Sequence, residues 1–158
     1  MEFRIIHHKE THLLRHKVLW PHIPKLEDCV IDIDESPGAI HLGVFLDSRL
    51  ISVGSLFEMH SAKIPHTDQY RLRAMATDPD FRGRHSGGML LENAKLILRQ
   101  KGIDALWCDA RLSAVGFYER LGFHKLPEVY EVKNIGPHHF MWFDLNISQV
   151  ENTTARGI

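Results

Sequence analysis

The sequence RLRAMATDPDFRGRHSGGMLLENAKLIL, residues 71–98, decides the fold of this chain. It opens with the two-residue alternation of a half-buried strand, with Tyr70, Leu72, Ala74 and Ala76 expected on one face and Arg71, Arg73, Met75 and Thr77 on the other. A turn at Asp78-Pro79 and a basic, glycine-rich loop follow, and then an amphipathic helix expected at residues 88–101. The first N–H groups of a helix lack intrahelical acceptors, and the helix dipole is positive there. The segment therefore predicts a phosphate site.

The composition is that of an ordinary globular protein. A length of 158 residues, with 44% hydrophobic and 25% charged residues, predicts one domain, which we expect at residues 1–147, followed by a polar tail at 148–158. A net charge of -1 gives no electrostatic reason to expect a nucleic-acid partner. No apolar run approaches the roughly 20 residues of a membrane span, and the N-terminus does not resemble a signal peptide. We therefore expect a cytoplasmic protein without a membrane partner.

The cysteines and histidines are the residues that could form disulfides or bind a metal. Cys29 and Cys108 are too few for a disulfide framework. Among twelve histidines, His8, His12 and His16 would share one face of a regular helix. This stripe has no second ligand cluster at a recognisable spacing in the sequence, so no metal is expected.

The remaining elements follow from periodicity and from Gly and Pro positions. We expect a strand at residues 3–6 and a helix at 11–20 that ends before Pro21. An irregular segment at 21–38 is expected to be either a binding loop or a plain connector. The rest predicts a hairpin of 39–46 with 50–59, a buried strand at 103–108, a helix from Ser113 to Gly122, and strands at 129–135 and 139–145 around Gly136-Pro137. This mixed order indicates the α+β class.

Two segments resemble the GNAT superfamily of N-acetyltransferases. TDPDFRGRHSGGMLLENAK, residues 77–95, carries that family's Gln/Arg-x-x-Gly-x-Gly/Ala signature for the acetyl-CoA pyrophosphate, and ARLSAVGFYERLGF, residues 110–123, carries its late Tyr-x-x-x-Gly-Phe helix. The ending GPHHFMWFDL, residues 136–145, is similar to a bacterial subgroup with a Gly-Pro-His turn near the last strand. The resemblance implies a three-layer fold, with a mixed, mostly antiparallel twisted sheet and helices on both faces.

The resemblance also implies a coenzyme site in which acetyl-CoA is a co-substrate. Backbone groups of Met75, Ala76 and Thr77 would pair with the pantetheine amides. The pyrophosphate would be held by the loop and the start of the helix, namely Arg82, Gly83, Arg84, His85, Ser86, Gly87 and Gly88. His85 stands where the signature has its first glycine. Histidine tolerates left-handed backbone geometry better than most residues, so we expect the loop to form.

Direct acetyl transfer to an amine needs a general base for the amine and a general acid for the leaving thiolate. The resemblance implies that Tyr118 is the acid; the alternative is an aromatic of the core. Candidate bases are His138, whose ordinary pKa suits the task, and Glu58, while His60 and Glu131 are further possibilities. The alternative for His138 is an ordinary turn histidine.

Arg71 and Arg73 stand on the strand where many GNAT relatives carry a glutamate. Two arginines can hold a carboxylate or phosphate, which leads to the hypothesis of an acceptor with an anionic group beside its amine. The alternative is that both arginines face solvent or pair with Glu58. Asp109 and Arg111 are candidates for acceptor contacts, or for an ion pair within a loop.

These observations predict an acetyl-CoA-dependent N-acetyltransferase, an acyltransferase that acts directly on a primary amine of a small, anionic acceptor. Two alternatives stay open: an acyl-CoA sensor without turnover, and an acetyltransferase of protein N-termini or lysines. The expected assembly is a monomer or a homodimer.

Overall fold

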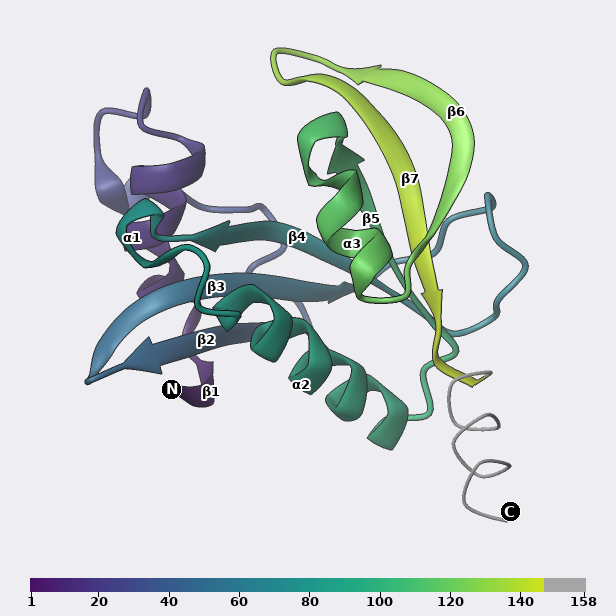
Figure 1. Cartoon of the computed structure of the whole chain (residues 1–158), viewed down its shortest axis with the longest axis horizontal. Coiled ribbons are helices and arrows are strands. Elements are labelled where there is room, and N and C mark those ends of the chain that lie inside the picture. The colour runs from purple at the N-terminus through teal and green to yellow at the C-terminus, as the bar shows by residue number, and fades with distance from the viewer. Residues whose placement is uncertain (147–158) are drawn as a thin grey trace. The chain divides into compact units, whose positions relative to one another are not determined.

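The computed structural model describes residues 1–146, and within them the chain forms a mixed seven-stranded sheet in the order β1-β2-β3-β4-β5-β7-β6 (Figure 1). The strands are β1 (Glu2–Ile6), β2 (Ile40–Leu46), β3 (Arg49–Glu58), β4 (Gln69–Thr77), β5 (Ala105–Arg111), β6 (His124–Val132) and β7 (Gly136–Asp144). The helices are α1 (His12–Leu14), α2 (Ser86–Gln100) and α3 (Val115–Arg120). This order and the mixed sheet with helices confirm the predicted fold.

The residue contacts divide the chain into two compact units. The first unit contains residues 1–58 and 72–94, and the second contains residues 59–71 and the described residues from Lys95 onward. The predicted polar tail at 148–158 lies outside the described residues. Within residues 1–146, no helix is both long enough and apolar enough to cross a membrane.

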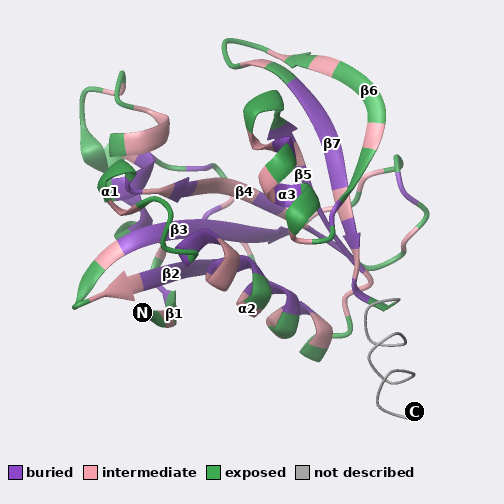
Figure 2. Ribbon diagram, viewed as in Figure 1, coloured by how far each residue is buried: buried purple, intermediate pink, exposed green. Residues whose placement is uncertain are grey.

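In the first unit, β1, β2 and β3 form an antiparallel meander. The β2–β3 turn places Asp47 and Ser48 at positive φ, as a tight hairpin turn requires. The middle of β3 is fully buried (Figure 2). One of its faces packs Val53 against Ile6 and Leu14, and the other face places Gly54 against Leu90 of α2. Helical segments therefore cover both faces of β3.

β4 departs from the alternation that the sequence predicts. Ala74 has a φ of 50°, which is a left-handed conformation inside a strand. The side chains of both Leu72 and Met75 lie beside Gly54, whereas Ala76 packs in the cluster of Val53, on the other face. The prediction that Leu72 and Ala76 share a face was wrong, because the left-handed residue shifts the alternation by one position.

In the second unit, β5 is antiparallel to β7, and β7 is antiparallel to β6. Residues 105–108 of β5 are all buried, as the apolar run predicted. The first residues of β4, Gln69 to Arg71, pair in parallel with Ala105 to Trp107.

The closing hairpin was predicted with the wrong bounds. β6 begins at His124, five residues before the predicted start at Val129. A register shift between Lys125 and Val129, around Pro127, interrupts the regular alternation of the first part of β6, so the sequence pattern did not predict it. Gly136 and Pro137 begin β7 and do not form the turn, so His138 is a strand residue.

Both helices of the family resemblance are present with small differences in their ends. α2 starts at Ser86, two residues before the predicted start at Gly88. Ser113 does not cap α3: it lies in a 3-10 turn, Leu112–Ala114, and α3 begins at Val115 after an Ala114 N-cap without a side-chain hydrogen bond. Gly102 and Gly122 have positive φ, as predicted for residues that end helices.

Substituting each of two glycines, one within α3 and one just after it, is expected to change the free energy of unfolding in opposite directions. Gly122 has a φ of 88°, and a Cβ there would lie 3.0 Å from Phe143 Cε2. We expect Gly122→Ala to lower the free energy of unfolding by about 1–2 kcal/mol, the cost of a left-handed alanine. Gly116→Ala is the matched control. Gly116 is an exposed helical residue, and among residues 1–146 its Cβ would meet only the flexible Arg120 side chain, so we expect a gain of about 0.5–1 kcal/mol. Urea denaturation measures both, and equal effects would contradict the assigned backbone geometry.

Candidate active site

The loop before α2 is anchored at its start by Asp78. This buried carboxylate accepts hydrogen bonds from the Lys17 ammonium at 3.0 Å, from Arg49 at 3.4 Å and from the Asp80 backbone N–H at 3.0 Å. The Asp78 N–H in turn donates to the Ile51 carbonyl at 2.8 Å. The hydrogen bonds from Lys17, together with those from Asp80 and Arg49, lower the pKa of Asp78 although burial opposes this, so the anchor is charged at neutral pH.

The end of the loop is anchored by a chain of hydroxyl groups. Ser52 on β3 bonds to Thr77 on β4 at 2.7 Å and to Ser86 of α2 at 2.8 Å. These contacts tie the last residue of β4 and the first residue of α2 to the same strand. The loop between them has fixed ends.

The loop itself carries the features of an anion site. Arg82, Gly83, Arg84 and His85 are exposed, and both Gly83 and His85 have positive φ, of 78° and 61°. The Met89 N–H bonds to the His85 carbonyl at 3.0 Å, so His85 begins the helical hydrogen-bond ladder. The N–H groups of Ser86, Gly87 and Gly88 are then those of the first turn, which have no acceptor within the helix. His85 therefore adopts the left-handed geometry expected of the signature's glycine.

Tyr118 is buried in the second unit, with 7% of its surface exposed. It is hydrogen-bonded to Cys108 and packs edge to face on Phe123, with the ring centroids 5.3 Å apart. Burial raises the pKa of the Tyr118 hydroxyl well above its ordinary value, and burial followed by the nearby Asp109 raises that of the Cys108 thiol. Both groups are therefore protonated at neutral pH. Tyr118 can donate a proton but cannot accept one as a phenolate.

A polar cluster lies beside the end of β5 in the same unit. Arg71 Nη2 donates to Asp109 Oδ2 at 2.6 Å, and the Tyr130 hydroxyl donates a short hydrogen bond to Asp109 Oδ1. The Arg71 guanidinium also lies over the Trp107 ring, 5.0 Å from its centroid. Burial, and then the bond to Asp109, raises the pKa of Tyr130. The positive charge of Arg71 is therefore matched by Asp109, a pairing that was not among the alternatives drawn from the sequence.

Tyr130 was not identified from the sequence. Its place near the cluster follows from the strand register, which the structure supplies. Tyr130 pairs with His138 across β6 and β7, and the two rings are stacked with centroids 6.4 Å apart. His138 is buried, and its Nδ1 lies 2.7 Å from the Gly136 carbonyl. Because a carbonyl can only accept, Nδ1 carries the proton and Nε2 holds the free lone pair of a potential base.

The other sequence candidates are exposed or half-buried. Arg111 is exposed and pairs in register with His138. Glu58, at the end of β3, is exposed and belongs to the first unit, as does the half-buried Arg73. The other two candidate bases, His60 and Glu131, are exposed.

The chain resembles known acetyltransferases over nearly its whole length. Residues 6–123 match the model of the acetyltransferase (GNAT) family. The chain is 35% identical over 149 residues to the uncharacterized N-acetyltransferase YitI of Bacillus subtilis, an alignment that covers 94% of this chain and 99% of that protein. It is 41% identical over 61 residues to the [ribosomal protein bS18]-alanine N-acetyltransferase of Salmonella typhimurium, covering 37% and 41% of the two chains.

A solved structure of similar fold is an aminoglycoside 6′-N-acetyltransferase complexed with coenzyme A. The TM-score is 0.72 at 13% identity, and the alignment covers 92% of this chain and 97% of that one. The match to the family model, residues 6–123, includes both the phosphate-binding signature and the tyrosine-bearing helix. The chain therefore belongs to the GNAT family of acetyltransferases.

Proposed function

We propose that this protein transfers the acetyl group of acetyl-CoA directly to the primary amine of a small acceptor. The observation that carries the proposal is the loop of residues 82–88, which presents two exposed arginines and a first helical turn immediately after a left-handed His85. Backbone donors and guanidinium groups of this kind suit a pyrophosphate. The pantetheine amides would pair with backbone groups of Met75, Ala76 and Thr77, next to the left-handed Ala74.

We propose Tyr118 as the general acid and His138 Nε2 as the general base. The amine nitrogen attacks the thioester carbonyl, the carbon–sulfur bond breaks, Tyr118 gives its proton to the leaving thiolate, and His138 takes the proton from the amine. The hydrogen bond from Nδ1 to the Gly136 carbonyl supports this role, because it fixes the tautomer. Glu58 remains the second candidate base; His138→Gln and Glu58→Gln, compared at the same pH, distinguish the two.

The acceptor is proposed to be a small primary amine that does not require an anionic group. The ion pair with Asp109 supports this, because an acceptor carboxylate would have to compete with Asp109 for Arg71. An acceptor with a carboxylate beside its amine tests the hypothesis that Arg71 and Arg73 bind an anionic group of the acceptor.

Release of free thiol from acetyl-CoA tests the proposed reaction. The panel contains an amino acid, a carboxylate-free polyamine, an aminoglycoside and a peptide with a free N-terminal alanine. We expect saturable release that requires both acetyl-CoA and one of the small amines. Release with the peptide alone would favour a protein acetyltransferase. Saturable binding of acetyl-CoA without release on any amine would overturn the proposal in favour of a sensor.

The backbone at His85 predicts how the coenzyme site responds to substitution. We expect His85→Val to weaken coenzyme A binding by about 10-fold, because a β-branched side chain is strained by roughly 1–3 kcal/mol at positive φ. His85→Gly is the matched control and should keep the affinity within about 3-fold, since glycine adopts this geometry freely. Calorimetric titration measures both. An equal loss in the two variants would mean that the imidazole itself contacts the phosphates.

A further inference from the structure

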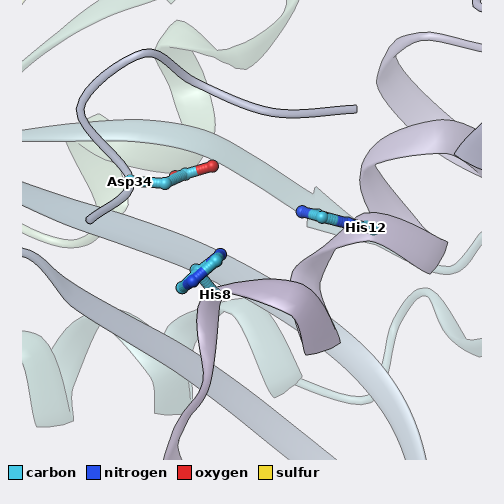
Figure 3. Close-up of side chains that lie close together, drawn as sticks. All are labelled: His8, His12 and Asp34. Carbon is cyan, nitrogen blue, oxygen red and sulfur yellow. The ribbon is translucent and has the colours of Figure 1, made fainter. Parts of the chain in front are cut away.

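Three potential metal ligands meet in the first unit, and none of them belongs to the coenzyme loop of residues 82–88. His8, His12 and Asp34 each place one ligand atom so that the three atoms lie within 4.8 Å of one another. Figure 3 shows the His12 side chain extending from its helix toward Asp34, with the His8 ring below both. His12 and Asp34 are buried, with 6% and 5% of their surfaces exposed, and His8 is half-buried.

The two histidines each have a ring nitrogen that needs a partner. His8 Nδ1 and His12 Nε2 are buried, and neither has a hydrogen-bond partner in the described part of the chain. An unpaired buried polar atom is costly, which makes a bound group between them favourable.

The partner groups around the cluster match those that support metal ligands. The opposite nitrogen of His8, Nε2, lies 3.2 Å from the Glu35 carboxylate, the arrangement that commonly fixes the tautomer of a ligating histidine. Asp34 Oδ2 accepts hydrogen bonds from Arg15 and from the Ile31 N–H, whereas Oδ1 accepts one bond, from Arg15 Nη2 at 2.8 Å. Oδ1 therefore keeps a lone pair for a cation.

A neighbouring histidine is excluded from the ligand set by its own bonds. His41 Nε2 donates to the Asp34 carbonyl at 2.9 Å, and its Nδ1 bonds to the Ser55 hydroxyl at 2.8 Å. His16 is also excluded, because its Nε2 donates to the Ile23 carbonyl at 2.8 Å. The ligand set is thus two imidazoles and one carboxylate.

We propose that His8, His12 and Asp34 form a binding site for a divalent transition-metal ion of the Zn²⁺ type. Two imidazoles and a carboxylate are ligands for zinc and its neighbours and are poorly suited to magnesium or calcium. In a tetrahedral zinc site the ligand atoms lie about 3.4 Å apart, so the side chains must close inward from their present spacing. The site joins the first helical segments to the irregular segment at 21–38.

Arg15 sets the expected strength of the site. Its guanidinium is fully buried and bonds to both Asp34 oxygens, so it places a positive charge next to the carboxylate that would bind the cation. The positive charge of Arg15 is neutralised by Asp34. The Glu35 carboxylate adds a further negative charge beside His8. A cation is therefore accommodated, with lower affinity than at a site without the arginine.

Calorimetric titration of the chelator-treated full chain with ZnSO₄ tests the proposal. We expect one saturable site per chain, a rise in the unfolding temperature with zinc, and neither effect with MgSO₄. His8→Gln and His12→Gln should each weaken zinc binding by at least about 10-fold, the loss typical of a ligand or its support. His22→Gln is the matched control, because His22 is an exposed histidine of the same unit.

Each outcome of this experiment decides for or against the site. Zinc binding that survives in both ligand variants, or that is lost equally in His22→Gln, would assign the ion to other histidines and overturn the proposal. No saturable binding of zinc at all would also overturn the proposal. If His12→Gln does not fold by circular dichroism, His8→Gln decides, because His8 is only half-buried.

Discussion

Tyr118→Phe is expected to lower kcat for acetyl transfer by about 100-fold, the lower range for loss of a general acid. The substitution removes only the hydroxyl, so the ring keeps its packing on Phe123. The KM for acetyl-CoA should change by less than about 2-fold, because a group that acts on the leaving thiolate contributes in the transition state and little to ground-state binding. Single-turnover kinetics measure the chemical step without product release.

Cys108→Ala is the control for Tyr118→Phe. It removes the hydrogen-bond partner of the tyrosine and keeps the hydroxyl, so we expect kcat to stay within about 5-fold of the wild type, well short of the loss expected for a general acid. If Tyr118→Phe retains kcat to the same extent, Tyr118 is an aromatic of the core and another group, or water, supplies the proton.

The pH dependence of the same reaction provides a second readout. The pKa of Tyr118 is raised by burial, so the protonated acid persists above the ordinary tyrosine pKa of about 10. The wild-type rate should therefore show no alkaline loss from this group up to about pH 10. A loss of rate that begins below that pH and disappears in Tyr118→Phe would contradict the assigned burial.

The parts of the fold that were predicted well are those written locally in the sequence. The loop of residues 82–88 combines glycines, arginines and a helix start within one segment, and His85 adopts the left-handed geometry that its position required. The continuous apolar run of β5 likewise lies within one short segment, and it correctly predicted a buried strand. Periodicity failed where the strands are irregular, at the left-handed Ala74 in β4 and at the register shift between Lys125 and Val129 in β6.

The parts that were missed depend on contacts between distant segments. Asp109 was assigned to an acceptor contact or an ion pair, and only the structure pairs it with Arg71 and Tyr130. The histidine stripe was expected on a regular helix, but residues 8–19 form a 3-10 turn, a short α-helix and a π-helical turn in succession. This irregular winding leaves His16 outside the cluster. Asp34 joins His8 and His12 from a segment whose conformation no periodicity specifies.

Arg15→Met is expected to lower the free energy of unfolding by about 3–5 kcal/mol, because it leaves a buried carboxylate without its partner. Arg15 is fully buried and bonds to Asp34 at 2.7 and 2.8 Å, and it also donates to Ser55 Oγ at 3.0 Å. Burial alone would raise the pKa of Asp34, but the bonds from Arg15 and from the Ile31 N–H outweigh it, so Asp34 is charged at neutral pH. Urea denaturation in the presence of a chelator measures the loss without any contribution from metal.

The double variant Arg15→Met with Asp34→Asn separates the ion pair from general loss of packing. The asparagine at position 34 can still accept the Ile31 N–H but carries no charge, so no uncompensated buried charge remains. We expect the double variant to be more stable than Arg15→Met alone, although it has one more substitution. If the double variant is instead less stable than Arg15→Met alone, the loss of stability in Arg15→Met comes from packing around the methionine. The Asp34 carboxylate is then not the group that Arg15 stabilises.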